Sequence, residues 1–211
     1  MNDVQRWAGL YRVLEDGVDI GTEAWTREIS DDQVRLTSVI NRMDDEEYEE
    51  EIEIILEPDW RPLQVNVDRE SAEGTRRYIG RRVGSAWISQ IVRESGPMRT
   101  ATLEFDENTH VDYFTAHTNS VTMRRLALAP ETGAEISVVF IDPDTWNPSL
   151  VRQKYARLRD PEPFEAGGYQ ISRAYRYQGA SGLEYMIWTD EDDIILRYED
   201  VFEVVELTSV I

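Results

Sequence analysis

Short segments in which apolar and polar residues alternate, separated by turn residues, run through almost the whole chain and restrict it to a β-rich fold. Val65 and Val67, for example, alternate with polar neighbours, as in a strand with one face in water. Little helix is expected beyond a short turn near His117–Val121, which Thr118 or Asn119 could cap. The predicted strands, bounded by Gly, Pro, Asp and Ser, are Gly9–Leu14, Glu23–Ile29, Val34–Arg42, Tyr48–Leu56, Leu63–Arg69, Thr75–Gly80, Ala86–Glu94, Arg99–Phe105, Met123–Ala129, Glu135–Ile141, Gln153–Arg159, Tyr169–Tyr177, Leu183–Thr189, Ile194–Tyr198 and Phe202–Leu207.

An internal repeat predicts how these strands are organised. Glu51–Pro62 and Glu135–Pro148 both run from an apolar strand into a Pro-Asp pair, a tryptophan and a second proline, and the two tryptophans are expected at equivalent corners. Arg77–Gly80 is echoed by Arg176–Gly179, in the same order along the chain. Because each half alone would leave an apolar face uncovered, we predict a single β-rich domain over residues 1–211, with repeat-related halves of roughly 1–110 and 111–211.

The charge balance excludes several classes of partner. The chain has 42 acidic and 22 basic residues, a formal charge of −20, which repels phosphate backbones and anionic membrane surfaces. Nucleic acid is therefore not expected as a partner. The absence of cysteine excludes disulfides and thiolate chemistry. No apolar run of about 20 residues and no leader pattern occur, so we expect a cytoplasmic protein without membrane insertion.

Two adjacent arginines follow a polar turn, and they carry the main prediction of an internal polar group. On a strand over Met123–Ala129, Arg124 and Arg125 would point to opposite faces, so one guanidinium would point inward. An inward arginine needs either a carboxylate of the protein or an anionic or polyhydroxylated ligand.

The usual signatures of catalysis and cofactor binding are missing. Neither a nucleophile elbow nor a phosphate-binding glycine loop occurs, so no catalytic residue and no cofactor are predicted. His110, Asp112 and His117 could form a two-His-one-carboxylate site, but such a loose cluster is usually turn chemistry, and we predict no metal. The acidic run Asp190–Asp193 is expected to be a solvated turn.

Several separated motifs resemble one known family. Thr118-Asn119 with Arg124-Arg125-Leu126, and Pro148 followed by Gln153-Lys154-Tyr155, match its signatures, and the match is firmest over Glu104–Leu207. The chain thus resembles the putative glycolipid-binding family. That resemblance implies a spiral β-roll with a duplicated topology and a role in binding a glycolipid or similar amphiphile.

The sequence therefore predicts non-covalent binding of an amphiphilic or glycosylated small molecule in an internal cavity, with Arg124 or Arg125, Asn119, Gln153 and Tyr155 as polar anchors. Two alternatives stay open: an enzyme acting on a lipid or sugar conjugate, and a module that binds a protein through a β edge or an apolar patch. A deep closed pocket would separate the first two from the third, and a carboxylate or histidine aimed into it would favour the enzyme. Ligand identity and oligomeric state are not predicted.

Overall fold

One large sheet bends around a short helix in the computed structural model of the chain, which describes residues 4–44, 47–159 and 165–210. The prediction of a mainly β chain with little helix is confirmed, since the described residues contain only the helix α1 (Ala116–Leu126). The strands are β1 (Gln5–Glu15), β2 (Val18–Ile29), β3 (Val34–Arg42), β4 (Tyr48–Leu56), β5 (Pro62–Ser71), β6 (Gly74–Val83), β7 (Ala86–Arg93), β8 (Arg99–Glu104), β9 (His110–Asp112), β10 (Gly133–Ile141), β11 (Pro148–Arg157), β12 (Glu165–Ala166), β13 (Tyr169–Gln170), β14 (Arg173–Gln178), β15 (Glu184–Thr189), β16 (Ile195–Tyr198) and β17 (Phe202–Val210).

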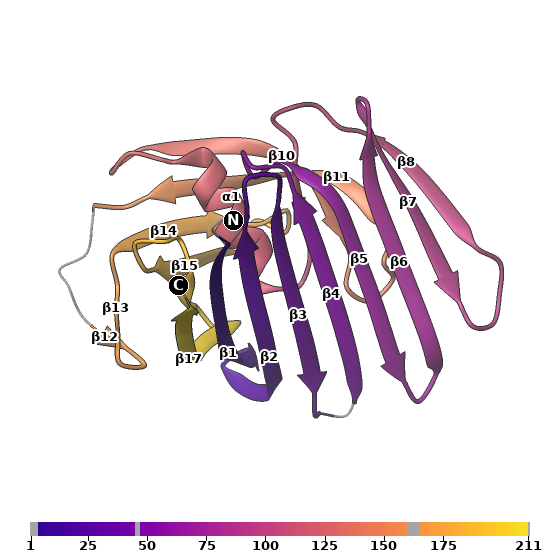
Figure 1. The fold of residues 1–211 in the computed structure, drawn as a ribbon, viewed down its shortest axis with the longest axis horizontal. Helices are drawn as coiled ribbons and strands as arrows, with labels where there is room; N and C mark the ends of the chain where they lie inside the picture. Colours follow the sequence, from indigo (N-terminus) through magenta and orange to yellow (C-terminus); the bar gives the residue numbers. More distant parts are fainter. Residues whose placement is uncertain (1–3, 45–46, 160–164, 211) are drawn as a thin grey trace.

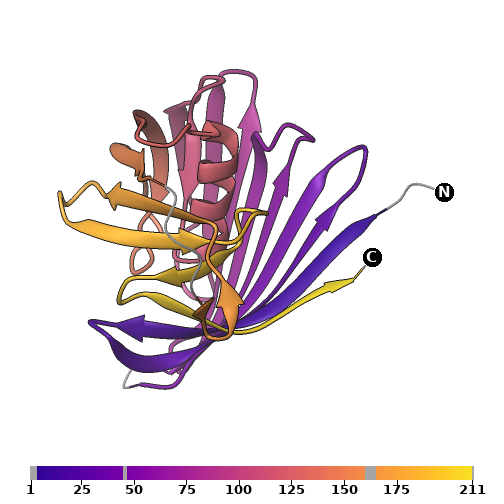
Figure 2. The ribbon, with the colours of Figure 1, turned by 90° about the vertical axis from the view of Figure 1, so that its left-hand side faces the viewer.

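The strand order shows how the sheet encloses the helix. It runs β8-β7-β6-β5-β4-β3-β2-β1-β17-β16-β15-β14-β11-β10-β9, antiparallel throughout except for the parallel pair β9–β10. β1 and β17 therefore join the early strands to the late ones. Figures 1 and 2 show β1–β8 as one wall, with α1 lying between it and the strands β10, β11 and β14. Residues of α1 contact both sides, Trp25 on β2 and Tyr155 on β11.

Alternating side chains explain why the central strands form. Every second residue is buried from Val34 to Ile40 in β3 and throughout β4, and both strands have the predicted bounds. Most of the buried residues are aliphatic, and burying each one stabilises the fold by about 1.5–3 kcal/mol. Ser38 on β3 and Glu50 on β4 are also buried in these rows, and Glu23 on β2 is fully buried. The interior of the bend is therefore partly polar.

The predicted strand Met123–Ala129 is wrong, because residues 116–126 form α1. The helix begins after Thr115, whose side chain accepts a hydrogen bond from the backbone N–H of His117, so the cap lies earlier in the chain than predicted. It ends at Ala127, which adopts the left-handed conformation with φ 42°. In the described part of the chain no helix is long and apolar enough to cross a membrane.

A second difference concerns the predicted strand Tyr169–Tyr177. It is broken after Gln170: β13 pairs with β12 in a separate small sheet, and β14 begins at Arg173 in the large one. The buried side chain of Ile171 lies in the break.

The two repeat-related corners are locally similar. Trp60 and Trp146 both have a left-handed backbone, with φ of 68° and 60°. Each indole also lies against two arginine guanidinium groups, at 5.0 and 5.5 Å from Trp60 and at 4.6 and 5.3 Å from Trp146. The duplication of the two halves and the spiral β-roll stay predictions.

The second pair of repeated segments lies in two hairpins, β6–β7 and β14–β15. In each, a glycine leaves space for the hydroxyl of the tyrosine two residues earlier. A Cβ atom on Gly80 would be 2.7 Å from the Tyr78 hydroxyl, and one on Gly179 would be 3.1 Å from the Tyr177 hydroxyl. A larger residue at Gly80 would force the Tyr78 hydroxyl and the Trp87 ring to move, whereas one at Gly179 would require only a small shift of Tyr177.

Candidate functional site

A cavity of about 170 Å³ lies beside the N-terminal half of α1. Its wall combines the connection from β9 to α1 with residues of β10, β14, β16, β17 and two turns. Four of the lining residues, Phe114, Phe140, Pro143 and Val201, are partly exposed, so the cavity opens to solvent. The lining residues are Asp112, Tyr113, Phe114, Thr115, Asn119, Phe140, Pro143, Tyr177, Tyr198, Val201 and Phe202.

Glu23 fixes the start of α1, and with it one wall of the cavity. Its carboxylate accepts hydrogen bonds from the Ser38 hydroxyl at 2.6 Å, from the Thr115 hydroxyl, and from the backbone N–H of Ala116 at 3.4 Å. A carboxylate is favourable at this position because the N-terminus of a helix is electropositive. Burial raises the pKa of Glu23, and the three hydrogen bonds oppose that shift.

Asp112 is the carboxylate that lines the cavity. One of its oxygens accepts from the Thr118 hydroxyl at 2.9 Å, and the other from Nε2 of Gln153 at 2.6 Å. Burial raises the pKa of Asp112, and these hydrogen bonds oppose the shift. Because both oxygens are already bonded, the carboxylate is held in one orientation.

Asn119 faces the same space and is oriented by Tyr155. The Tyr155 hydroxyl lies 2.7 Å from Oδ1 of Asn119 and 3.3 Å from Oε1 of Gln153. A hydroxyl carries one proton, so Tyr155 donates it to the nearer oxygen, that of Asn119. Nδ2 of Asn119 then has no hydrogen-bond partner among the residues that the structure describes, and it is available to a ligand.

Aromatic rings form much of the remaining wall. Tyr198 lies 6.0 Å from Tyr177 and 6.2 Å from Phe202, measured between ring centroids, and Phe114 lies 5.4 Å from Phe202. Burial raises the pKa of both tyrosines, so their hydroxyls stay protonated. Neither hydroxyl has a hydrogen-bond partner among the residues that the structure describes. The wall therefore offers flat apolar faces together with unused donors.

An ion pair lies directly behind the lining. Arg69 donates to Glu50 at 2.6 Å and to the backbone oxygen of Pro143 at 3.0 Å, and the Tyr113 hydroxyl donates to Glu50 at 2.9 Å. Burial raises the pKa of Glu50, and the charge of Arg69 is the largest opposing effect. Since Glu50 is fully buried, Arg69 offsets a charge that would otherwise be uncompensated.

Of the five predicted site residues, Asn119 lines the cavity. Gln153 and Tyr155 do not line it but are hydrogen-bonded to lining residues from behind, and Arg124 and Arg125 lie away from it. The prediction that alternation turns one arginine inward is wrong, because both lie in the last turn of a helix. Arg124 packs on Trp60 and lies 3.4 Å from a carboxylate oxygen of Asp193. Arg125 donates to two backbone oxygens, those of Thr109 at 3.1 Å and Glu107 at 2.8 Å.

The acidic run Asp190–Asp193 also differs from its prediction of a solvated turn. Asp193 is only 7% exposed and accepts from Arg173 at 2.5 Å. Arg27, itself 1% exposed, donates to the backbone oxygen of Asp192 at 2.9 Å. The turn is thus held against β2 by buried contacts.

The two histidines are both buried in the fold. His110 lies 3.2 Å from the Thr122 hydroxyl, and the ring of His117 packs edge-on to Trp25 with centroids 5.1 Å apart. Burial lowers the pKa of each imidazole from 6.5 to about 3. In residues 4–44, 47–159 and 165–210, no group of three His, Cys, Asp or Glu residues could hold a metal ion.

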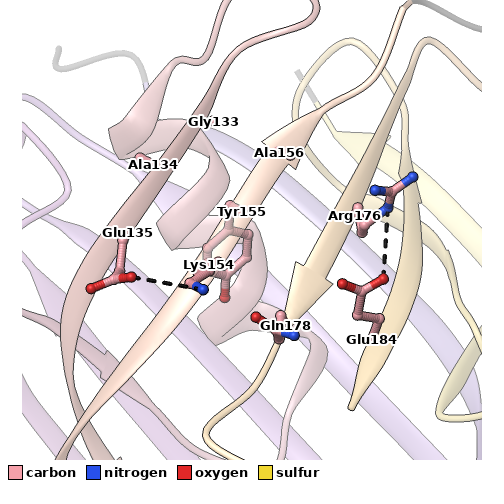
Figure 3. Close-up of a pocket in the computed structure, with 9 residues that line it drawn as sticks. All are labelled: Gly133, Ala134, Glu135, Lys154, Tyr155, Ala156, Arg176, Gln178 and Glu184. Carbon is pink, nitrogen blue, oxygen red and sulfur yellow. Dashed lines mark ion pairs between the residues drawn. The ribbon is translucent and has the colours of Figure 1, made fainter. Parts of the chain in front are cut away.

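A second, larger hollow of about 350 Å³ lies over the outer face of β10, β11 and β14 (Figure 3). Its charged side chains form two long ion pairs, Lys154 with Glu135 at 3.9 Å and Arg176 with Glu184 at 4.0 Å. All four are more than half exposed, so water competes for them. We therefore assign the candidate site to the smaller cavity, whose polar groups are buried and fixed.

The aromatic wall and the buried acids Glu23 and Glu50 were not predicted from the sequence. Glu50 had a usable signal, because it occupies a position in β4 that alternation assigns to the same face as Ile52 and Ile54. Tyr198 matches the family resemblance but was not assigned to a site, and Phe202 had no signal beyond that of a core residue.

Comparisons with known proteins agree with the fold. A DUF1089 family protein from Pseudomonas aeruginosa has 20% sequence identity and a TM-score of 0.58, and the match covers 86% of this chain and 91% of that one. A β-barrel-like protein of the domain of unknown function DUF1849 from Brucella abortus has 10% identity and a TM-score of 0.55, over 99% and 98% of the two chains. No curated protein matches the sequence. The family described as "Putative glycolipid-binding" matches residues 18–204, and the chain belongs to that family.

Proposed function

We propose that the cavity beside α1 binds a glycolipid or another amphiphilic small molecule without transforming it. The family name points to this class of ligand, and the site supplies the chemistry for it. The observation that carries the proposal is the combination of an aromatic wall with the free amide of Asn119 in one cavity. A cytoplasmic location remains a prediction from the sequence.

The two halves of the site have separate roles in this proposal. The rings of Tyr198 and Phe202 offer apolar faces to the ligand, while Nδ2 of Asn119 donates to its polar end. Tyr155 and Gln153 orient Asn119 and Asp112 from behind. Arg124 and Arg125 have no direct part, because their guanidinium groups bond to loops elsewhere.

An enzyme acting on a lipid or sugar conjugate remains the second candidate, and Asp112 is the observation that favours it. Asp112 lines the cavity, and its pKa is raised. A carboxyl group needs a raised pKa to act as a general acid at neutral pH. Against this role, the hydrogen bonds from Thr118 and Gln153 stabilise the ionised form of Asp112 and so oppose the protonation that a general acid needs. Turnover of a bound ester or glycoside that is lost in Asp112→Asn would decide for the enzyme.

The test of binding combines ligand recovery with a variant that fills the cavity. Organic extraction of the freshly purified protein followed by mass spectrometry should identify a bound amphiphile. Added ligand should raise the melting temperature as mass action requires. Val201→Trp places a large side chain at the open side of the cavity and should abolish the shift in melting temperature.

Val205→Trp is the matched control, because Val205 is 47% exposed on β17 and does not line the cavity. It should bind as the unmodified protein does. Unchanged binding by Val201→Trp would show that the ligand is bound elsewhere, with the outer hollow of Figure 3 as the next site to test.

A further inference from the structure

We infer that the cavity takes the uncharged, hydroxyl-rich headgroup of its ligand, that is, a neutral sugar, and that it excludes anionic headgroups and does not hold the alkyl chain. This inference rests on the proposed function and narrows it to one ligand class and one orientation. Three features of the cavity carry it: the charge of its lining, the hydrogen-bonding groups that remain unused, and its size.

The lining has no basic side chain to meet an anion. Its ionisable members are Asp112 and three tyrosines, and none of the lining residues is Arg, Lys or His. The guanidinium of Arg69 reaches the back of the lining at Pro143, but its charge is already paired with buried Glu50. A phosphate, sulfate or carboxylate in the cavity would therefore lose its hydration without gaining a contact with a cation. This holds whether Asp112 is protonated or ionised.

The unused polar groups suit sugar hydroxyls. Nδ2 of Asn119 can donate, and the hydroxyls of Tyr177 and Tyr198 can both donate and accept. None of the three has a hydrogen-bond partner in the part of the chain that the structure describes. A sugar ring presents hydroxyls at its edge and C–H groups on its faces, so it can use these groups while it stacks on Tyr198 or Phe202.

The size of the cavity indicates that it holds only one end of the ligand. Sites that enclose a drug-sized ligand measure about 300–1,000 Å³, and this one measures about 170 Å³. One end of an amphiphile fills it. Because an alkyl chain would leave the Asn119 amide and the tyrosine hydroxyls without partners, the sugar end is the one that fits. The chain then leaves past the partly exposed side chains of Phe140 and Val201.

Three ligands with the same chain test the inference: hexyl β-glucoside, hexyl β-glucuronide and hexanol. The glucuronide differs from the glucoside by a carboxylate, and hexanol lacks the sugar. Calorimetric titration at pH 7.5 and constant ionic strength should show the glucoside binding about tenfold or more tightly than either of the others. If the glucuronide or hexanol bound as tightly as the glucoside, the inference would be wrong, but the proposed function would still stand. If none of the three binds, the proposed function fails with it.

Tyr198→Phe tests the hydroxyl without disturbing the ring. It should weaken glucoside binding by about fivefold, the usual effect of one lost neutral hydrogen bond, and leave hexanol binding unchanged. Tyr185→Phe is the matched control, since that ring packs against Tyr198 at 5.7 Å but does not line the cavity. Equal effects of the two variants on glucoside binding would show that the Tyr198 hydroxyl does not contact the sugar.

Discussion

The buried imidazole of His117 should make the fold sensitive to acid. Its side chain is 2% exposed, and its Nε2 has no hydrogen-bond partner among the described residues. Burial, with a smaller contribution from the charge of Arg27, lowers the pKa of His117 from 6.5 to about 3. Below pH 6.5 the unfolded chain therefore binds a proton that the folded chain binds only near pH 3. Stability falls as the pH falls through this window.

The size of the effect follows from the two pKa values. At pH 4.5, two pH units below 6.5, protonation of the unfolded chain lowers the free energy of unfolding by about 2.7 kcal/mol. The buried acids Glu23, Glu50 and Asp112 act in the opposite direction, because their pKa values are raised and their burial costs less as they become protonated. The total pH dependence is thus a difference of opposing effects, and a variant is needed to isolate the histidine.

His117→Phe removes the titration while keeping a ring that packs on Trp25. Urea denaturation followed by tryptophan fluorescence, at pH 7.0 and 4.5 and at one ionic strength, gives the free energy of unfolding of both proteins. The loss on acidification should be about 2.5 kcal/mol smaller in the variant, because the carboxyl contributions cancel in the comparison. Parallel losses in the two proteins would refute the reasoning and would mean that folded His117 accepts a proton near pH 6.5.

Three further predictions concern charge. Arg69→Ala should lower the free energy of unfolding by about 3 kcal/mol, because it leaves Glu50 buried without its cation. Arg77→Ala breaks an exposed ion pair and should lower it by about 1 kcal/mol or less. Equal losses of the two variants in urea denaturation would contradict this prediction. Arg124→Ala and Arg125→Ala should each cost only about 1 kcal/mol, and a difference of several kcal/mol between them would contradict their placement on the helix surface. Since the formal charge is −20, molar potassium chloride should raise the melting temperature above its value in dilute buffer, and a flat or falling value would contradict a destabilising self-repulsion.

The strands could be predicted from the sequence where one face is apolar. Val34–Arg42 and Tyr48–Leu56 were predicted with their observed bounds, because alternation and the flanking turns agree there. Of the helix, only a short turn near His117–Val121 was predicted and not its full length, because its buried surface is mostly polar: His117, Asn119 and Ser120 are buried along with Val121 and Met123. Because these buried residues do not form an apolar stripe, the period of 3.6 residues is not visible in the sequence of the helix.

The site was predictable only in part, for a related reason. Asn119, Gln153 and Tyr155 came from the resemblance to the family, and they do lie together, although their use by a ligand stays a proposal. Their connection to Asp112, and that of Thr115 to Glu23 across 92 residues, depends on how the sheet bends around α1. Neither contact is encoded in any local pattern.

Arg124 and Arg125 do not line the cavity, but they lie on the same helix as Asn119, which does. At the end of the helix, Arg124 and Arg125 donate to backbone oxygens in the segments leading into β16 and β9, including those of Asp192 and Thr109. Those two strands carry cavity residues, Tyr198 on β16 and Asp112 on β9. The arginines therefore position strands on both sides of the cavity, while Asn119, on the same helix, faces its interior. In the proposed function the arginine pair therefore acts indirectly, by positioning the cavity wall, and not through direct contact of a guanidinium group with the ligand.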